Sequence, residues 1–157
     1  MNDITSYILE QAKKILSIDS PTGFTAHAAE YVLGAYKKLG YDAKLTNKGG
    51  IFVCVNDGPD QADDPADAPI LLEAHMDTLG GMVCSINEKG RLMLSALGGM
   101  NPNNAEAENC RVYTRSGKVY SGTFQLKNAS IHVNGSYNDT ARSYDCLLYT
   151  SPSPQDA

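Results

Sequence analysis

The chain has 157 residues, of which 42% are hydrophobic and 20% charged. This length and balance are those of a globular protein with one domain, or one domain and a fragment, and they exclude a disordered or fibrous chain. The formal net charge is −5 and the 13 lysines and arginines are scattered, which argues against the basic stripe that a nucleic-acid partner would need.

The N-terminal residues lack the apolar core of a signal peptide, because their apolar residues recur at helical spacing with lysines between them. No stretch approaches the roughly 20 apolar residues that a membrane span requires. We therefore expect a cytoplasmic protein with no membrane partner.

Two amphipathic helices are predicted at the start of the chain. Apolar residues recur at helical spacing from about Ile4 to Ile18 and again from about Ala26 to Leu39. Ser20-Pro21-Thr22-Gly23 lies between them, where proline and glycine break the first helix and favour a tight turn. Gly40 is a natural end for the second helix.

Strands are predicted after the helices. Residues 43–45 and 51–55 flank a glycine-containing turn and predict a hairpin or two neighbouring strands. The aspartate- and proline-rich residues 56–69 predict a solvated surface loop. Residues 70–74 predict an apolar strand that runs into His75-Met76-Asp77. Helices followed by such strands predict an α/β class, with a partial core of helices packed on a mixed sheet and the polar motif at the carboxyl end of a strand.

A second, β-rich module is predicted from the point where helical periodicity disappears, near Met82. Short strands with turn signals between them are expected at residues 82–86, 91–96, 111–114, 119–126 and 129–133. We therefore divide the chain into residues 1–80 and residues 81–145.

His75 and Asp77 are the candidate functional residues. Because they are two apart, their side chains leave the same face of an extended segment and can converge on one point. A neutral imidazole nitrogen suits zinc or cobalt, and a nearby carboxylate can orient that imidazole. The pair is short, and histidines paired with carboxylates are common in loops, so the spacing alone leaves a structural ion pair as the alternative.

Two motifs together give the chain a family resemblance. Ser20-Pro21-Thr22-Gly23 and Ala74-His75-Met76-Asp77-Thr78-Leu79-Gly80 resemble, in order and spacing, motifs of the cytosolic dinuclear metallopeptidases. That family includes glutamyl aminopeptidase and the TET aminopeptidases, and some of its members have been called cellulases. Residues 122–133 are also similar to the inserted β-domain of one branch of the family, so the resemblance covers roughly residues 1–145.

The resemblance implies roles for both candidate residues. His75 would bind one of two divalent cations, zinc or cobalt, and Asp77 would be the catalytic carboxylate that sits behind it. Thr78 stands where many relatives have a glutamate, which would alter the local hydrogen bonding. The family removes N-terminal residues from peptides with a metal-activated water and a carboxylate base.

The resemblance also implies that much of the catalytic site lies downstream. In the family the bridging aspartate, the glutamate base and the remaining ligands follow the inserted domain, so we expect an N-terminal fragment that is inactive by itself. A homo-oligomer is expected for the complete enzyme, because the family's inserted domain makes contacts between subunits.

Two other functions stay open. A glycosidase is suggested by the old cellulase name, although glycosidases need two opposed carboxylates instead of a histidine-led metal site. The β-rich segment could also be an assembly or protein-binding module without catalysis.

Residues 146–157 do not continue the family pattern. They are similar to the conceptual translation of a sequencing-library adapter, Cys-Leu-Leu-Tyr-Thr-Ser-Pro-Ser-Pro-Arg-Asp, from which only Gln155 departs. An ordinary disordered tail is the alternative. We therefore expect a non-native tail, and we assign no functional role to Cys146 or Tyr149.

Overall fold

The computed structural model describes residues 3–55, 70–145 and 147–150. These residues form two compact units, and the boundary between the units lies between Thr78 and Leu79. The loop predicted over residues 56–69 lies outside the described residues, as do Cys146 and residues 151–157 of the predicted tail. No helix within the described ranges is long and apolar enough to cross a membrane.

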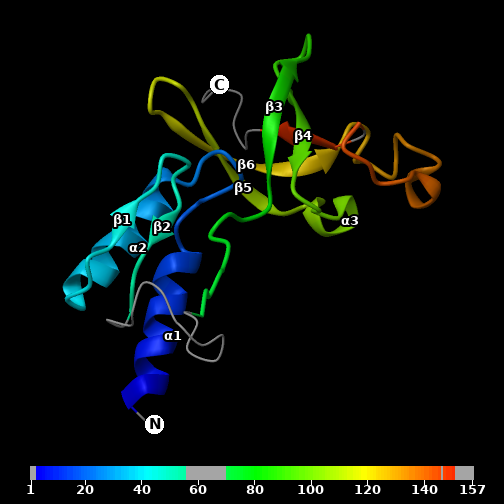
Figure 1. Ribbon diagram of the computed structural model, residues 1–157. Helices are drawn as coiled ribbons and strands as arrows, with labels where there is room; N and C mark the ends of the chain where they lie inside the picture. Colours follow the sequence, from blue (N-terminus) through cyan, green and yellow to red (C-terminus); the bar gives the residue numbers. More distant parts are fainter. Residues whose placement is uncertain (1–2, 56–69, 146, 151–157) are drawn as a thin grey trace. The chain divides into compact units, whose positions relative to one another are not determined.

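Two helices open the first unit (Figure 1). Helix α1 spans Asp3–Leu16 and helix α2 spans Ala26–Lys38, so both predicted helices are confirmed and the first ends two residues early. Acidic Asp3 in the first turn of α1 and the basic Lys13 and Lys14 in its last turn complement the helix dipole.

A small hairpin follows the helices and contacts α2. Strand β1, Lys44–Leu45, pairs antiparallel with strand β2, Ile51–Phe52. The predicted hairpin is confirmed, although its second strand is shorter than expected. The small side chains of Ala28 and Ala29 on α2 and of Ala43 before β1 are buried.

The strand predicted over residues 70–74 is wrong. Among the described residues this segment pairs with no strand, and the side chains of Ile70, Leu71 and Leu72 are 87%, 72% and 89% exposed. A strand needs a neighbour that takes its backbone hydrogen bonds, and the described part of the first unit supplies none. Pairing begins only at Thr78, which forms an isolated parallel bridge with Pro21.

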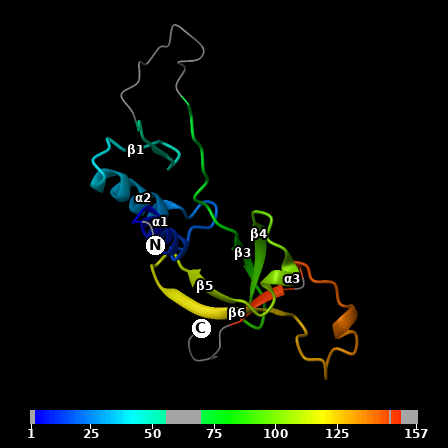
Figure 2. The same ribbon diagram turned by 90° about the horizontal axis from the view of Figure 1, so that it is seen from below.

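The second unit is built on a five-stranded antiparallel sheet (Figures 1 and 2). Its strands are β3 at Gly80–Ile86, β4 at Leu92–Leu97, β5 at Asn109–Tyr113, β6 at Val119–Leu126 and β7 at Leu147–Thr150. Their order is β3-β4-β7-β6-β5, so the two hairpins β3–β4 and β5–β6 are joined through β7. The first four strands lie close to the predicted positions.

The strand predicted over residues 129–133 is also wrong. This segment forms a turn in which the backbone N–H groups of Val133 and Asn134 both donate to the carbonyl of Ser130, at 3.1 and 2.8 Å. A carbonyl that accepts these local bonds is no longer free for a strand partner.

The main hydrophobic cluster of the second unit lies on one face of this sheet, and Leu148, which points to the opposite face of β7, is buried as well. Phe124 and Leu126 of β6, Leu147 of β7 and Ala105 of helix α3, which spans Pro102–Ala105, form one buried cluster. Leu147 and Leu148 are each 1% exposed. Adapter-like residues from the predicted tail therefore occupy a central strand of the sheet.

An arginine holds the segment that leads back to β7. The Arg142 guanidinium donates to the Glu106 carboxylate at 2.7 Å and lies 4.8 Å from the centre of the Tyr137 ring. It also donates to the carbonyls of Tyr137 and Thr140, at 3.0 and 2.7 Å. This network orders the 3-10 helix η2, Tyr137–Asp139, against the residue that follows α3.

Candidate metal centre

The centre is built around the turn that follows α1. Gly23 adopts a φ of +86°, a conformation that glycine reaches without steric cost. The Phe24 N–H donates to the Pro21 carbonyl at 2.7 Å and closes the turn. The predicted tight turn at Ser20-Pro21-Thr22-Gly23 therefore forms.

This turn is bonded to the segment that carries the candidate residues. The Ser20 hydroxyl donates to the Met76 carbonyl at 2.9 Å, and the Thr78 N–H donates to the Ser20 carbonyl at 2.9 Å. Ser20 is only 2% exposed, so its buried hydroxyl has the partner that burial requires. These bonds fix the backbone on either side of Asp77.

The structure brings the side chains of His75 and Asp77 together. Nδ1 of His75 lies 3.0 Å from the backbone carbonyl oxygen of Asp77 and 3.3 Å from its Oδ1. Both neighbours are acceptors, so the proton of the neutral ring belongs on Nδ1 and the lone pair on Nε2. The His75 side chain is 87% exposed, and its Nε2 can therefore reach a cation.

The second carboxylate oxygen of Asp77 is held by Thr22. The Thr22 hydroxyl donates to Oδ2 at 2.6 Å. This hydrogen bond, aided by the backbone N–H of Asp77 and by His75, lowers the pKa of the Asp77 carboxyl below its ordinary value, so the carboxylate stays ionised to a lower pH than a free aspartate does. Sequence reasoning placed Thr22 only in the turn and missed this contact. The only sign of this contact in the sequence is the hydroxyl donor at the third position of the Ser-Pro-Thr-Gly motif.

The residues of the centre fit one ligand position of a metal site. The metal donor is Nε2 of a single imidazole, and Nδ1 of the same ring faces the Asp77 carboxylate. A carboxylate in that position orients metal-binding histidines. Across residues 3–55, 70–145 and 147–150, no three His, Cys, Asp or Glu side chains gather closely enough to hold a metal ion. A two-cation site would therefore require further ligands from outside these residues.

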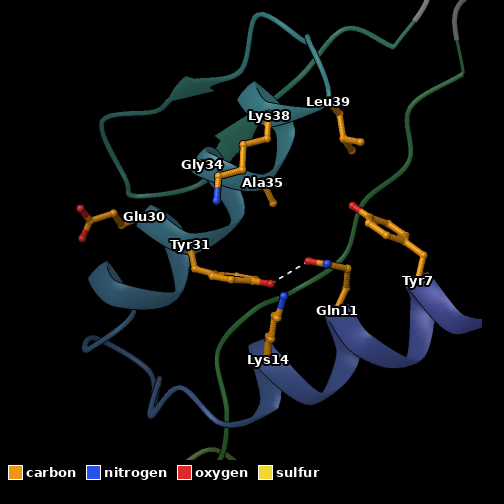
Figure 3. A pocket seen from close by; sticks show the side chains of 9 residues that line it. All are labelled: Tyr7, Gln11, Lys14, Glu30, Tyr31, Gly34, Ala35, Lys38 and Leu39. Carbon is orange, nitrogen blue, oxygen red and sulfur yellow. Dashed lines mark hydrogen bonds between the residues drawn. The ribbon is translucent and has the colours of Figure 1, made fainter.

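A separate groove lies between the two helices of the first unit (Figure 3). It has a volume of about 370 Å³ and is lined by residues that include Tyr7, Gln11, Tyr31 and Lys38. The Tyr31 hydroxyl donates to the Gln11 side-chain oxygen at 2.6 Å across it. None of the described residues that line the groove belongs to the candidate metal centre.

Solved structures share this fold. The chain superposes on a TET aminopeptidase from a marine-sediment Thaumarchaeota archaeon with a TM-score of 0.75 and 18% identity, covering 96% of this chain and 40% of that one. It also superposes on the TET1 peptidase of Pyrococcus horikoshii with a TM-score of 0.69 and 22% identity, covering 89% of this chain and 39% of that one. The predicted α/β class with a partial peptidase core is confirmed by these neighbours, whereas both sheets in the described residues are antiparallel and not mixed as predicted.

Two curated relatives match the sequence more closely. The chain is 35% identical to the YhfE protein of Bacillus subtilis (strain 168) over 85% of its own length and 36% of that protein. It is 32% identical to the glutamyl aminopeptidase of Lactococcus lactis subsp. cremoris (strain MG1363) over 71% of its own length and 30% of that enzyme. The chain thus spans about a third of the length of the curated relatives it matches.

The family model of the M42 glutamyl aminopeptidases matches residues 50–146. That match includes the segment that carries His75 and Asp77 and most of the second unit, so the resemblance drawn from the sequence motifs is confirmed. The chain belongs to the M42 glutamyl aminopeptidase family.

Proposed function

We propose that this chain is the N-terminal part of a two-metal aminopeptidase that removes N-terminal residues from peptides. Membership of the M42 family supports the reaction class. The observation that carries the proposal is the His75 ring, whose Nδ1 faces Asp77 while the exposed ring leaves Nε2 available. Hydrolysis by metal-activated water needs such an oriented nitrogen ligand.

This geometry and the family membership support the following proposed roles. His75 holds one of two divalent cations, zinc or cobalt, through Nε2, and Asp77 keeps the ring in the required tautomer and orientation. When bound, the cations would supply Lewis-acid chemistry that lowers the pKa of a water and polarises a carbonyl. The general base and the other ligands come from the part of the protein that follows this chain.

We further propose a cytoplasmic homo-oligomer in which the second unit contributes contacts between subunits. Strand β3 lies at an edge of the sheet, and it exposes Met82, Val83 and Ile86 at 57%, 42% and 66%. An exposed apolar edge strand is a ready surface for another chain. The TET1 peptidase of Pyrococcus horikoshii can assemble into a tetrahedron or a large octahedral shell.

Metal-dependent turnover tests the proposed reaction. The complete protein should release the N-terminal residue from short peptides, lose this activity on dialysis against a chelator and recover it with zinc or cobalt. The 157-residue chain should show no turnover under the same conditions, because one histidine and its carboxylate cannot hold two cations and also supply a base. Chelator-resistant cleavage of a glycoside would instead favour the glycosidase alternative.

We propose that residues 146–157 derive from an adapter and not from the native gene. The support is the match of consecutive residues described above, with Gln155 as the one difference. Resequencing the locus should give a reading frame that departs from this sequence near Asp145. Recovery of the same codons followed by a stop codon would refute an adapter origin.

A further inference from the structure

We propose that the Ser20–Thr22 turn positions the metal centre, and that the Thr22 hydroxyl sets the orientation of Asp77 and, through it, of His75. Thr22 is thus a positioning residue and not a catalytic one. This inference rests on the proposed function, since it assigns a role behind the proposed metal ligand.

The first support is that the segment with the candidate ligand has no sheet to hold it. Among the described residues the backbone of residues 70–77 is in no strand, and the stretch before the motif is highly exposed. The Ser20 hydroxyl and the Ser20 carbonyl bind the backbone at Met76 and Thr78, each at 2.9 Å. The turn therefore supplies the anchoring that a neighbouring strand would otherwise give.

The second support is that the two oxygens of the Asp77 carboxylate have different partners. Oδ2 accepts from the Thr22 hydroxyl at 2.6 Å, and Oδ1 lies 3.3 Å from Nδ1 of His75. A carboxylate bound at one oxygen can still turn about its last torsion, which is broad. The Thr22 hydrogen bond at Oδ2 restricts that rotation and keeps Oδ1 near Nδ1 of His75, which also lies 3.0 Å from the Asp77 carbonyl oxygen.

The third support is that the Asp77 carboxylate is partly exposed to solvent. The Asp77 side chain is 38% exposed, so water competes for both oxygens when a partner is removed. The Thr22 hydroxyl is held in place against water because threonine is β-branched and its χ1 torsion has few allowed rotamers. A valine of the same shape would keep the packing and lose only the hydrogen bond, which makes Thr22→Val the decisive substitution.

The test compares three variants of the complete protein. Thr22→Val removes the hydroxyl, Thr22→Ser keeps it, and Thr25→Val makes the same exchange at a hydroxyl that forms no capping bond at the start of α2. The measurements are zinc affinity by competition with a chromogenic chelator, kcat and KM for a peptide substrate, and the melting temperature.

Thr22→Val should weaken binding of the zinc ion held through His75 by about tenfold. It should lower kcat by a similar factor and change KM little. Thr22→Ser should keep most of the affinity, and Thr25→Val should match the unmodified protein. A purely structural role would lower the melting temperature of Thr22→Val and leave zinc affinity unchanged, which would overturn the inference. Equal losses in Thr22→Ser and Thr22→Val would also overturn it, because the hydroxyl would then not be the determinant.

A parallel His75→Ala measurement separates this inference from the proposed function. If His75→Ala loses a cation while Thr22→Val does not weaken zinc binding, only the role of Thr22 fails. If His75→Ala keeps both cations and full activity, the proposed metal centre itself fails.

Discussion

Replacement of His75 by alanine in the complete protein is expected to remove one bound cation and to reduce kcat/KM by about 10³-fold or more. Lewis-acid activation of water and carbonyl contributes several kcal/mol to hydrolysis, and each 1.36 kcal/mol is a factor of ten in rate. The measurements are metal content per chain by mass spectrometry and turnover of an aminoacyl chromogenic substrate.

The matched control for this substitution is His27→Ala. The His27 ring packs edge to face on Phe24 with ring centres 5.9 Å apart, and we assign it no role at the metal. His27→Ala should keep both cations and the activity of the unmodified protein. Two cations per chain in the His75→Ala protein would show that His75 is not a ligand.

Phe124→Ala is expected to destabilise the second unit by about 3–5 kcal/mol, the usual cost of deleting a buried phenylalanine side chain. Phe124 is 7% exposed and packs with Ala105, Leu126 and Leu147. This loss is comparable to the entire stability of many small domains, so much of the second unit should be unfolded at 25 °C. The measurement is the denaturation midpoint of the 157-residue chain, followed by circular dichroism.

Val119→Ala is the control on the same strand. Val119 begins β6 and is 48% exposed, so its truncation should change stability by no more than about 0.5 kcal/mol. Hydrogen exchange adds a local measure, because amides of β5 and β6 should lose protection in Phe124→Ala and keep it in Val119→Ala. Equal effects of the two substitutions would contradict the proposed core.

The helices could be predicted because their determinants are local. Apolar spacing marks α1 and α2, and Gly40, with its φ of +90°, ends the second one. The convergence of His75 and Asp77 was also local, since it needs only an extended backbone over three residues. The motif shows the Thr22 hydroxyl but not its partner, because the bond to Asp77 joins residues 55 positions apart.

The two wrong strands fail for one physical reason. An apolar or alternating run indicates which residues can form a strand, whereas the strand itself exists only when another backbone takes its hydrogen bonds. Residues 70–74 have no such neighbour among the described residues, and residues 129–133 satisfy backbone groups within their own turn. The pairing of β7 with β4 and β6 is likewise a long-range event that no local pattern indicates.

The place of β7 determines how the second unit can fold. Hairpins β3–β4 and β5–β6 each close through a short turn, so each can form within microseconds once its residues are free to pair. Strand β7 pairs Tyr149 with Leu92 of β4 and Leu147 with Leu126 of β6. Because these partners lie far apart in the sequence, loop-closure entropy is lost before the contacts of β7 compensate for it. We therefore expect the docking of this four-residue strand to be the slow step in folding of the 157-residue chain. Until it is complete, β4 and β6 of the 157-residue chain present open edges on which a second unfolded chain can pair, and misfolding competes with folding.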